Sequence, residues 1–307
     1  MVDTEEEFDW SRPFARDRHA TTAARAIPVA HARFAAAGVP LTYLTSYPIA
    51  TDPAAIAAIA PLLADGSTVG AQLHSWVTPP FVEELTTANS FAGNLPEAVE
   101  AAKLDALTDA IARGFGQRPI VYRAGRYGLG PNTAALLGGR GYRFDSSIRP
   151  GHDYSPEGGP DFSGNDNLPR ALAPGLVGLP VSTVFTGGLR RGGGQLHQAL
   201  GRVPKARGLF ARAGLLSRVA LTPEGMPIPE ARRAVATAIS DGVPLLTFSF
   251  HSPSLVPGHT PYVRDARDLA TFWAWWDAML AWLAAQGVAP IGIDALAEAL
   301  GGGGAIR

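Results

Sequence analysis

Two carboxylates near the start of the chain have a spacing that allows one to bind a metal ion and the other to transfer protons. Asp3 and Glu5 lie two residues apart in a segment expected to end a β-strand, so their side chains point to the same side. Two carboxylates this close stay ionised together cheaply only when a cation or an arginine lies between them. One is therefore expected to bind a metal ion while the other handles protons. The alternative, solvated surface acids, suits Glu6 and Glu7 better than Asp3, which continues a strand.

A single histidine, His74, follows the apolar residues 69–73 and enters a proline-containing turn. A lone histidine in this position is more often hydrogen-bonded to the backbone than bound to a metal. A second metal-binding histidine four residues later would fall on Thr78. From these residues alone, His74 is either a metal ligand or a buried structural histidine.

Two further side chains at expected strand ends suit proton transfer. Arg123 follows the apolar residues 119–122, so it is expected to be buried and to need an anionic partner, with Asp3 as the first candidate and Asp145 as the second. His251 ends the apolar stretch 243–250, where it is either a general acid or a buried imidazole bonded to the backbone.

The composition excludes several classes of protein. The chain has 307 residues, a net charge of −1 and 17% charged residues, so it has no strong field to attract nucleic acid or anionic membranes. It has no cysteine, which excludes disulfides, thiolate nucleophiles and cysteine-based zinc sites. Any metal must use histidine, carboxylate or hydroxyl ligands.

The termini and the apolar runs indicate where the protein resides. No apolar run is long enough to span a bilayer, and the acidic start "MVDTEEEFDW" is not a secretory signal. We therefore expect a cytoplasmic protein. Residues 1–3 resemble the end of a strand whose beginning is missing, which leaves open a start upstream of Met1.

The elements that must position these side chains alternate along the chain. Helices are expected at 19–38, 52–66, 96–116 and 130–141, and strands at 39–50, 67–75, 119–126, 142–148, 176–185, 243–252 and 288–293. Such alternation predicts an α/β fold with parallel strands, and seven or eight units favour a closed or nearly closed (β/α) barrel over a doubly wound sheet. We expect a single domain over residues 1–307, with residues 301–307 as a disordered tail. In such barrels the chemistry lies at the carboxyl ends of the strands.

Residues 187–220 interrupt this alternation. They contain two glycine clusters and a run of basic residues without acids: Arg190, Arg191, Arg202, Lys205, Arg207, Arg212 and Arg218. We interpret the segment as a basic, solvated helical insertion. The alternative is a lid or patch that contacts an anionic glycan or lipid head group through residues 190–218.

Four tryptophans lie in residues 273–282, at a spacing that predicts a helix packed on the barrel. Only Trp273 or Trp275, if exposed, is a candidate for stacking on a sugar.

Six motifs in order resemble those of a known family. They are "VDTEEEFDW", "GAQLHSWVTPPF", "NSFAGNLP", "YRAGRYG", "GYRFDSSIRPG" and "FSFHSPSLVPG". The sequence resembles the polysaccharide deacetylase family, that is, the NodB-homology domain or carbohydrate esterase family 4, and in particular its WalW-like branch in lipopolysaccharide and exopolysaccharide biosynthesis. The resemblance runs from Asp3 to about Asp294.

The resemblance implies a distorted (β/α)7-type barrel and metal-dependent hydrolysis of N-acetyl, or O-acetyl, groups on a saccharide. It implies Asp3 as the catalytic base, Arg123 as its partner and His251 as the general acid, oriented by Asp145 or, alternatively, Asp153. In the mechanism that we infer from these roles, the metal and a backbone N–H in the Tyr127–Gly128 turn would stabilise the oxyanion. Substrate contacts are expected from Trp76, Arg126 and Tyr127.

The resemblance also implies a divalent metal, zinc above others, with Glu5 and His74 as ligands. Glu5 replaces the family's usual aspartate, and Thr78 stands at the position of a metal-binding histidine. A neutral hydroxyl is a poor zinc ligand. Three alternatives follow: Glu6 or Glu84 replaces the missing ligand, the metal binds weakly with extra waters, or none binds.

Two other functions compete with saccharide deacetylation. One is a barrel that has lost hydrolysis and binds a saccharide or serves in assembly, which the Thr78 substitution favours. The other is hydrolysis of a small non-sugar amide. The presence of Asp3, Arg123, Asp145 and His251 favours a hydrolase, since a binding protein needs no such set of proton-transfer groups.

Overall fold

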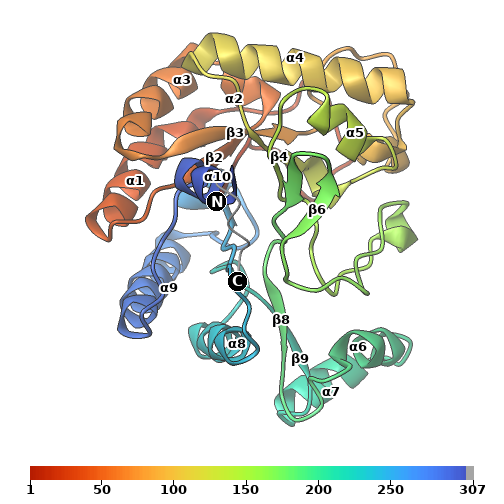
Figure 1. Ribbon diagram of the computed structural model, residues 1–307, viewed down its shortest axis with the longest axis vertical. Helices are drawn as coiled ribbons and strands as arrows, with labels where there is room; N and C mark the ends of the chain where they lie inside the picture. The colour runs from red at the N-terminus through yellow and green to blue at the C-terminus, as the bar shows by residue number, and fades with distance from the viewer. Residues whose placement is uncertain (302–307) are drawn as a thin grey trace.

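An eight-stranded sheet is the centre of the computed structural model, which describes residues 1–301 (Figure 1). In spatial order its strands are β10 (Phe250–His251), β1 (Val2–Thr4), β2 (Thr42–Thr45), β3 (Thr68–Leu73), β4 (Val121–Ala124), β5 (Phe144–Asp145), β7 (Leu176–Gly178) and β6 (Arg170–Ala173). All neighbours from β10 to β7 pair in parallel, and β6 alone is antiparallel. The prediction of an α/β fold with parallel strands is confirmed.

Helices pack around the outer side of this sheet (Figure 1). They are α1 (Ile27–Ala36), α2 (Tyr47–Thr51), α3 (Pro53–Ile59), α4 (Glu97–Phe115), α5 (Thr133–Gly138), α8 (Ile228–Ser240) and α9 (Ala266–Ala285). A further helix, α10 (Ile293–Gly301), packs its Ile293 and Leu296 against Leu44 and Val121 of the strands in a second, separate core cluster. Alternate residues of each strand therefore face the two cores, as the period of a β-strand requires.

The sheet curves toward closure without completing it by strand pairing within residues 1–301. Isolated backbone hydrogen bonds link the segment after β7 and the segment around residue 221 to the residues before β10. The Ser182 N–H donates to Thr247 O at 3.2 Å, and the Ser249 N–H donates to Leu221 O at 3.2 Å. The barrel is thus distorted and incompletely closed. The expected strand at 288–293 is wrong, because residues 288–292 pair with no strand and α10 begins at Ile293.

Three other predicted boundaries differ for local reasons. The expected strand 39–50 ends at Thr45, because Pro48 suits the first turn of a helix and α2 begins at Tyr47. The segment 176–185 divides into β7 and β8 (Thr183–Thr186), which belong to different sheets. The segment 243–252 forms only the short strand β10.

The basic segment forms an arm, defined here as residues 183–220, that projects away from the central sheet (Figure 1). Strands β8 and β9 (Ser217–Ala220) pair antiparallel, and their connection carries α6 (Gly193–Gly201) and α7 (Ala206–Arg212). The helical prediction is confirmed for these two helices and is wrong for 217–220, which is a strand. The single-domain assignment stays a prediction, and the expected disorder of residues 302–307 lies outside the described residues.

The tryptophan-rich segment forms α9, as predicted. Trp275 is buried and its Nε1–H donates to Met226 O at 2.9 Å, while the Trp273 ring lies 4.6 Å from the Arg33 guanidinium. These contacts leave neither ring in the cavity described below. None of the helices in residues 1–301 combines the length and hydropathy needed to cross a bilayer.

A buried lysine on α4 holds the loop after β3. The Lys103 ammonium donates to the carbonyl oxygens of Ser75, Thr78 and Pro80 at 2.9, 2.6 and 2.7 Å. It also lies 3.1 Å from the Glu83 carboxylate. The Lys103 side chain therefore provides the hydrogen-bond donor for three carbonyl groups of this loop, which would otherwise be buried without a partner.

We expect Lys103→Met to lower the free energy of unfolding by roughly 2–4 kcal/mol, because three buried carbonyl groups would lose their donor and Glu83 would keep only the more distant Arg16, at 3.8 Å, as its ionic partner. Urea denaturation of both proteins measures the change. The matched control is Lys205→Met on the exposed arm, which should leave stability unaltered. Equal stability of Lys103→Met and the parent protein would contradict this account.

Candidate active site

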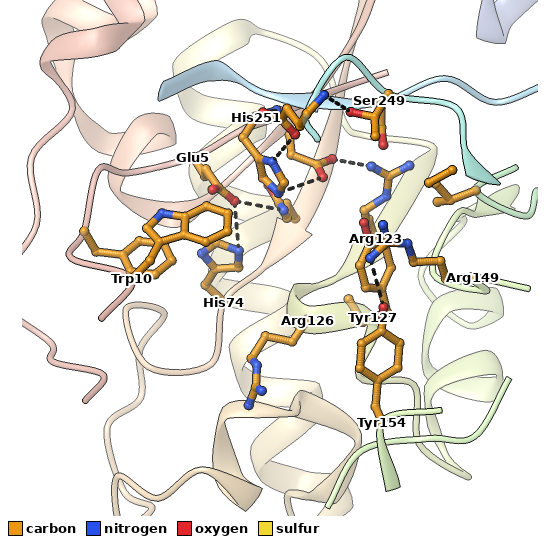
Figure 2. A pocket seen from close by; sticks show the side chains of 18 of the residues that line it. Glu5, Trp10, His74, Arg123, Arg126, Tyr127, Arg149, Tyr154, Ser249 and His251 are labelled. Atoms are coloured by element: carbon orange, nitrogen blue, oxygen red, sulfur yellow. Dashed lines mark hydrogen bonds and ion pairs between the residues drawn. The ribbon is translucent and has the colours of Figure 1, made fainter. Parts of the chain in front are cut away.

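A cavity of about 360 Å³ opens at the carboxyl ends of β1, β3, β4 and β10. Asp3, Glu5, His74, Arg123 and His251 all line it, although they come from segments up to 248 residues apart. Figure 2 shows four of these side chains around one space, with Glu5 and His74 beside His251 and with Arg123 nearby. The structure therefore brings together the residues that the sequence placed at strand ends.

The first pair in the cavity is Asp3 with Arg123. The Arg123 Nη1 bonds Asp3 Oδ1, while its Nε donates to Ser146 O at 2.9 Å and its Nη2 to Ser146 Oγ at 3.0 Å. Both side chains are buried, so each charge depends on the other. The arginine partner expected from the sequence, Asp3 rather than Asp145, is the one observed.

The second group is His74 between two glutamates. Its Nδ1 lies 2.8 Å from Glu6 Oε1, and its Nε2 lies 3.4 Å from Glu5 Oε2. Burial raises the pKa of Glu5 to about 7, against the attraction of His251 and His74. Burial would lower the pKa of His74, but the charge and hydrogen bond of Glu6 outweigh it and raise the pKa. Glu6 thus fixes the ring so that Nε2 faces Glu5 and the cavity.

Glu6 and Glu7 are not the solvated acids expected from the sequence. Glu6 is fully buried by its contact with His74. Glu7 is buried because its carboxylate accepts from the Ala23 N–H and from Thr22 Oγ1, at the start of a 3-10 helix (Thr22–Ala26). Free N–H groups at a helix start attract a carboxylate, which explains the burial of Glu7.

The third pair joins His251 to a residue that the sequence did not indicate, Glu224. His251 Nδ1 lies 2.7 Å from Glu224 Oε2, and the His251 N–H donates to Glu224 Oε1 at 3.0 Å. Burial opposes protonation of His251, but the charges of Glu224 and Glu5 outweigh it and raise the pKa to about 10. Its Nε2 lies 3.7 Å from Asp3 Oδ2, which connects this pair to the first.

The predicted partners of His251, Asp145 and Asp153, lie elsewhere. Asp145 is buried outside the cavity, where its carboxylate accepts from Ser147 Oγ at 2.5 Å and burial raises its pKa to about 6. Asp153 is exposed and accepts from the Ser155 N–H at 2.9 Å. Neither aspartate is the partner of His251, because Glu224 occupies that position with contacts to both the His251 N–H and Nδ1.

Thr78, predicted as the third metal ligand, does not line the cavity. It is fully buried and its Oγ1 has no hydrogen-bond partner, because Lys103 draws the loop toward α4 through the Thr78 carbonyl. The substitutes considered for it do not fill its place: Glu6 is bound to the far nitrogen of His74, and Glu84 is exposed.

Within residues 1–301 no group of three His, Asp or Glu side chains is arranged to hold a metal ion. Two donors nevertheless fit one. Glu5 Oε2 and His74 Nε2 lie 3.4 Å apart, the separation of two ligands that share an ion at about 2.0–2.1 Å each. The Glu6 contact at the other ring nitrogen is the outer partner that metal-binding histidines use. The geometry suits a divalent ion held by two protein ligands and waters.

The predicted substrate contacts have mixed outcomes. Trp76 lines the cavity, but its ring is only 2% exposed and stacks on His74 with 4.3 Å between centroids, so most of it supports the histidine. Arg126 lines the cavity, but its guanidinium is bonded to Ser90 Oγ and Glu157. Tyr127 also lines the cavity.

The turn expected to stabilise an oxyanion is partly committed to the fold. Arg126 and Tyr127 have positive φ of 54° and 61°, which is uncommon outside glycine and marks a strained turn. The Gly128 N–H donates to Gly125 O at 3.0 Å, which leaves the Tyr127 N–H as the candidate.

An exposed tryptophan at the rim was also missed from the sequence. Trp10 is 38% exposed and meets the His251 ring edge-on at 5.2 Å between centroids. The sequence feature that could have indicated Trp10 is its position seven residues after Asp3, in the loop after the first strand. For Glu224 the signal was its place in a Pro-Glu-Gly turn after the apolar residues 219–221.

Comparisons with known proteins give remote similarities. No family model and no curated protein matches the chain. Among solved structures it is similar to a protein from Mycobacterium smegmatis described as a polysaccharide deacetylase, with 20% identity, 88% of this chain and 81% of that chain covered, and a TM-score of 0.47.

Two further solved structures are similar. One is a protein from Pseudomonas aeruginosa PAO1 described as a polysaccharide deacetylase, with 17% identity, 86% and 68% of the two chains covered, and a TM-score of 0.46. The other is Puue allantoinase, with 15% identity, 83% and 66% covered, and a TM-score of 0.47. At TM-scores below 0.5 these similarities do not by themselves assign an activity to this chain.

We expect Glu224→Gln to lower the pKa of His251 from about 10 by roughly one unit or more, because it removes the negative charge beside the imidazolium and keeps a group of the same shape. An NMR titration of the histidine ring signals measures the shift. Asp145→Asn, at the predicted but unobserved partner, is the control and should leave the His251 titration unaltered. If Asp145→Asn lowers the pKa of His251 and Glu224→Gln does not, then Asp145 and not Glu224 is the partner of His251.

Proposed function

We propose that this chain is a polysaccharide deacetylase-like hydrolase that removes an acetyl group from a nitrogen, or an oxygen, of a saccharide. The observation that carries the proposal is the meeting of two proton-transfer pairs in one cavity: Asp3 with Arg123 and His251 with Glu224, with 3.7 Å between His251 Nε2 and Asp3 Oδ2. The ordered motifs of the sequence support the same family. A carboxylate base and an imidazolium acid on either side of a reacting carbonyl suit amide hydrolysis.

The steps follow from the charges of these pairs. Asp3, held by Arg123, accepts the proton of a water as the water oxygen bonds to the acetyl carbon. A raised pKa keeps His251 protonated at neutral pH, so its Nε2 donates a proton to the amine as the C–N bond breaks. The products are acetate and a free amine. The Tyr127 N–H is the proposed donor to the oxyanion.

Glu5 and His74 would hold a divalent metal, with zinc favoured by the carboxylate and imidazole donors. When bound, such an ion supplies Lewis acidity to a water and to the acetyl carbonyl. Glu6 orients His74, and Gln72 donates to Glu5 Oε2 at 3.2 Å, so both donors are held before any ion binds.

The competing function is saccharide binding without hydrolysis. It is favoured by the displacement of Thr78 from the cavity, which leaves two protein ligands where catalytic zinc sites commonly have three. The two functions differ in acetate release and in metal affinity.

We expect His251→Ala and Asp3→Asn each to reduce acetate release from N-acetylated oligosaccharides by about 100-fold or more, because each removes one proton-transfer step. Enzymatic detection of acetate measures the rate. His259→Ala, outside the cavity, is the control and should retain full activity. No acetate release by the parent protein, with saccharide binding intact, would favour the competing function.

We expect His74→Ala to abolish zinc binding and Thr78→Ala to leave zinc affinity unaltered, because only His74 presents a donor to the cavity. Metal content after dialysis and zinc titration of each variant are the measurements. A chelator should stop acetate release by the parent protein. Loss of zinc binding in Thr78→Ala would show that the loop rearranges to bring Thr78 to the metal.

A further inference from the structure

One charged side chain in the cavity has no matching charge. The other ionic side chains that line the cavity each have an oppositely charged partner within 4.0 Å, in the pairs Asp3–Arg123, Glu5–His74, Glu224–His251, Arg126–Glu157 and Arg12–Asp9. Arg149 lines the same cavity, and no carboxylate in residues 1–300 lies within that distance of it. The positive charge of Arg149 is therefore directed into the cavity without compensation.

Aromatic groups hold Arg149 in place. Its Nη1 donates to the Tyr154 hydroxyl at 3.1 Å, and its guanidinium lies 5.0 Å from the centre of the Tyr127 ring. Its Nε is buried and has no hydrogen-bond partner. A cation–π contact replaces only part of the hydration that the partly buried Arg149 guanidinium loses. The position of Arg149 therefore lowers the stability of the fold and leaves part of the guanidinium without a hydrogen-bond partner.

The surroundings of Arg149 add positive charge. Arg218, on β9, donates to Gly151 O at 2.8 Å, and burial followed by the charge of Arg149 lowers its pKa to about 10. His152 stays neutral, because burial and then Arg149 lower its pKa to about 2. The acid next to Tyr154 in this region, Glu157, is paired with Arg126, so it does not neutralise Arg149.

The proton-transfer groups lie on the other side. Figure 2 shows Arg149 and Tyr154 separated from Glu5, His74 and His251, with the cavity between them. A substrate whose acetyl group reached His251 would extend toward Arg149. The cavity of about 360 Å³ is within the range of small-molecule sites, roughly 300–1,000 Å³.

We propose that Arg149 and the Tyr154 hydroxyl bind an anionic group of the substrate, a carboxylate or a phosphate. Tyr154 accepts a hydrogen bond from Arg149 Nη1, so its own O–H is free to donate, and Arg149 Nη2, for which the described residues provide no acceptor, is a second donor. A planar guanidinium with a neighbouring hydroxyl matches either oxyanion. This inference rests on the proposed function and names its substrate class: an acetylated saccharide that carries a negative charge.

The test compares charged and neutral sugars that share one acetamido group. The probes are N-acetylglucosamine 1-phosphate, N-acetylmuramic acid and neutral N-acetylglucosamine, and isothermal titration calorimetry gives the affinity for each. We expect the parent protein to bind at least one charged sugar about tenfold or more tightly than the neutral one, the effect of one or two charge-assisted hydrogen bonds. The sugar that shows the preference identifies the anionic group.

Variants assign the preference to this site. Arg149→Gln should reduce the ratio of charged to neutral affinity to near unity, and Tyr154→Phe should reduce it several-fold, about the effect of one hydrogen bond. Arg149→Lys keeps the charge, loses the planar geometry and should give an intermediate ratio. Arg113→Gln, an exposed arginine on α4, is the control for net charge and should retain the parent ratio. If Arg149→Gln proves unfolded by thermal denaturation, Arg149→Lys and Tyr154→Phe decide.

The inference is overturned if the parent protein shows no preference for either charged sugar, or if the preference is unreduced in Arg149→Gln or, where that variant is unfolded, in both Arg149→Lys and Tyr154→Phe. It is separable from the proposed hydrolysis, because binding needs no turnover. An Arg149-dependent preference without acetate release would remove the hydrolysis and support the anion site. If the parent protein releases acetate and the Arg149 variants leave the preference for charged sugars unaltered, the hydrolysis is supported and the anion site is rejected.

Discussion

The buried ion pair between Asp3 and Arg123 is the interaction on which the site depends. Asp3 lies on β1 and Arg123 on β4, and two strands separate them in the sheet. Their side chains meet only because the sheet curves and both point to its inner side. Two desolvated charges tolerate burial only as a pair, so the interaction ties the curvature of the sheet to the position of the proposed base.

The inner side of the sheet is divided between packing and chemistry. Apolar side chains of the strands, such as Leu44 and Val121, fill one part with the help of α10. Two residues farther along β4 the same side presents Arg123 to the cavity. Helix α10 thus covers the apolar part of this side, and the carboxyl ends of the strands carry the polar groups of the cavity.

The cavity separates its charges in a way that suits an extended substrate. On one side a carboxylate base and an imidazolium acid lie close together, and on the other side Arg149 faces neutral aromatic rings. The charges of Asp3, Arg123, His251 and Glu224 balance one another, so none of them neutralises Arg149. The distribution of charge would therefore orient the substrate in the cavity, with its acetyl group at the proton-transfer residues and its anionic group at Arg149.

The sequence by itself determined the alternation of strands and helices and the polar residues at strand ends, because both follow from local periodicity and from turn residues. Asp3, His74, Arg123 and His251 were found in this way, and the structure places them around one cavity. Only the tertiary structure decided which partners they have. Glu224 reaches His251 from a segment that follows the arm, and Lys103 on α4 draws the Thr78 loop out of the cavity. Such contacts depend on packing between distant segments, and spacing along the chain did not indicate them, although it did name Asp3 first as the partner of Arg123.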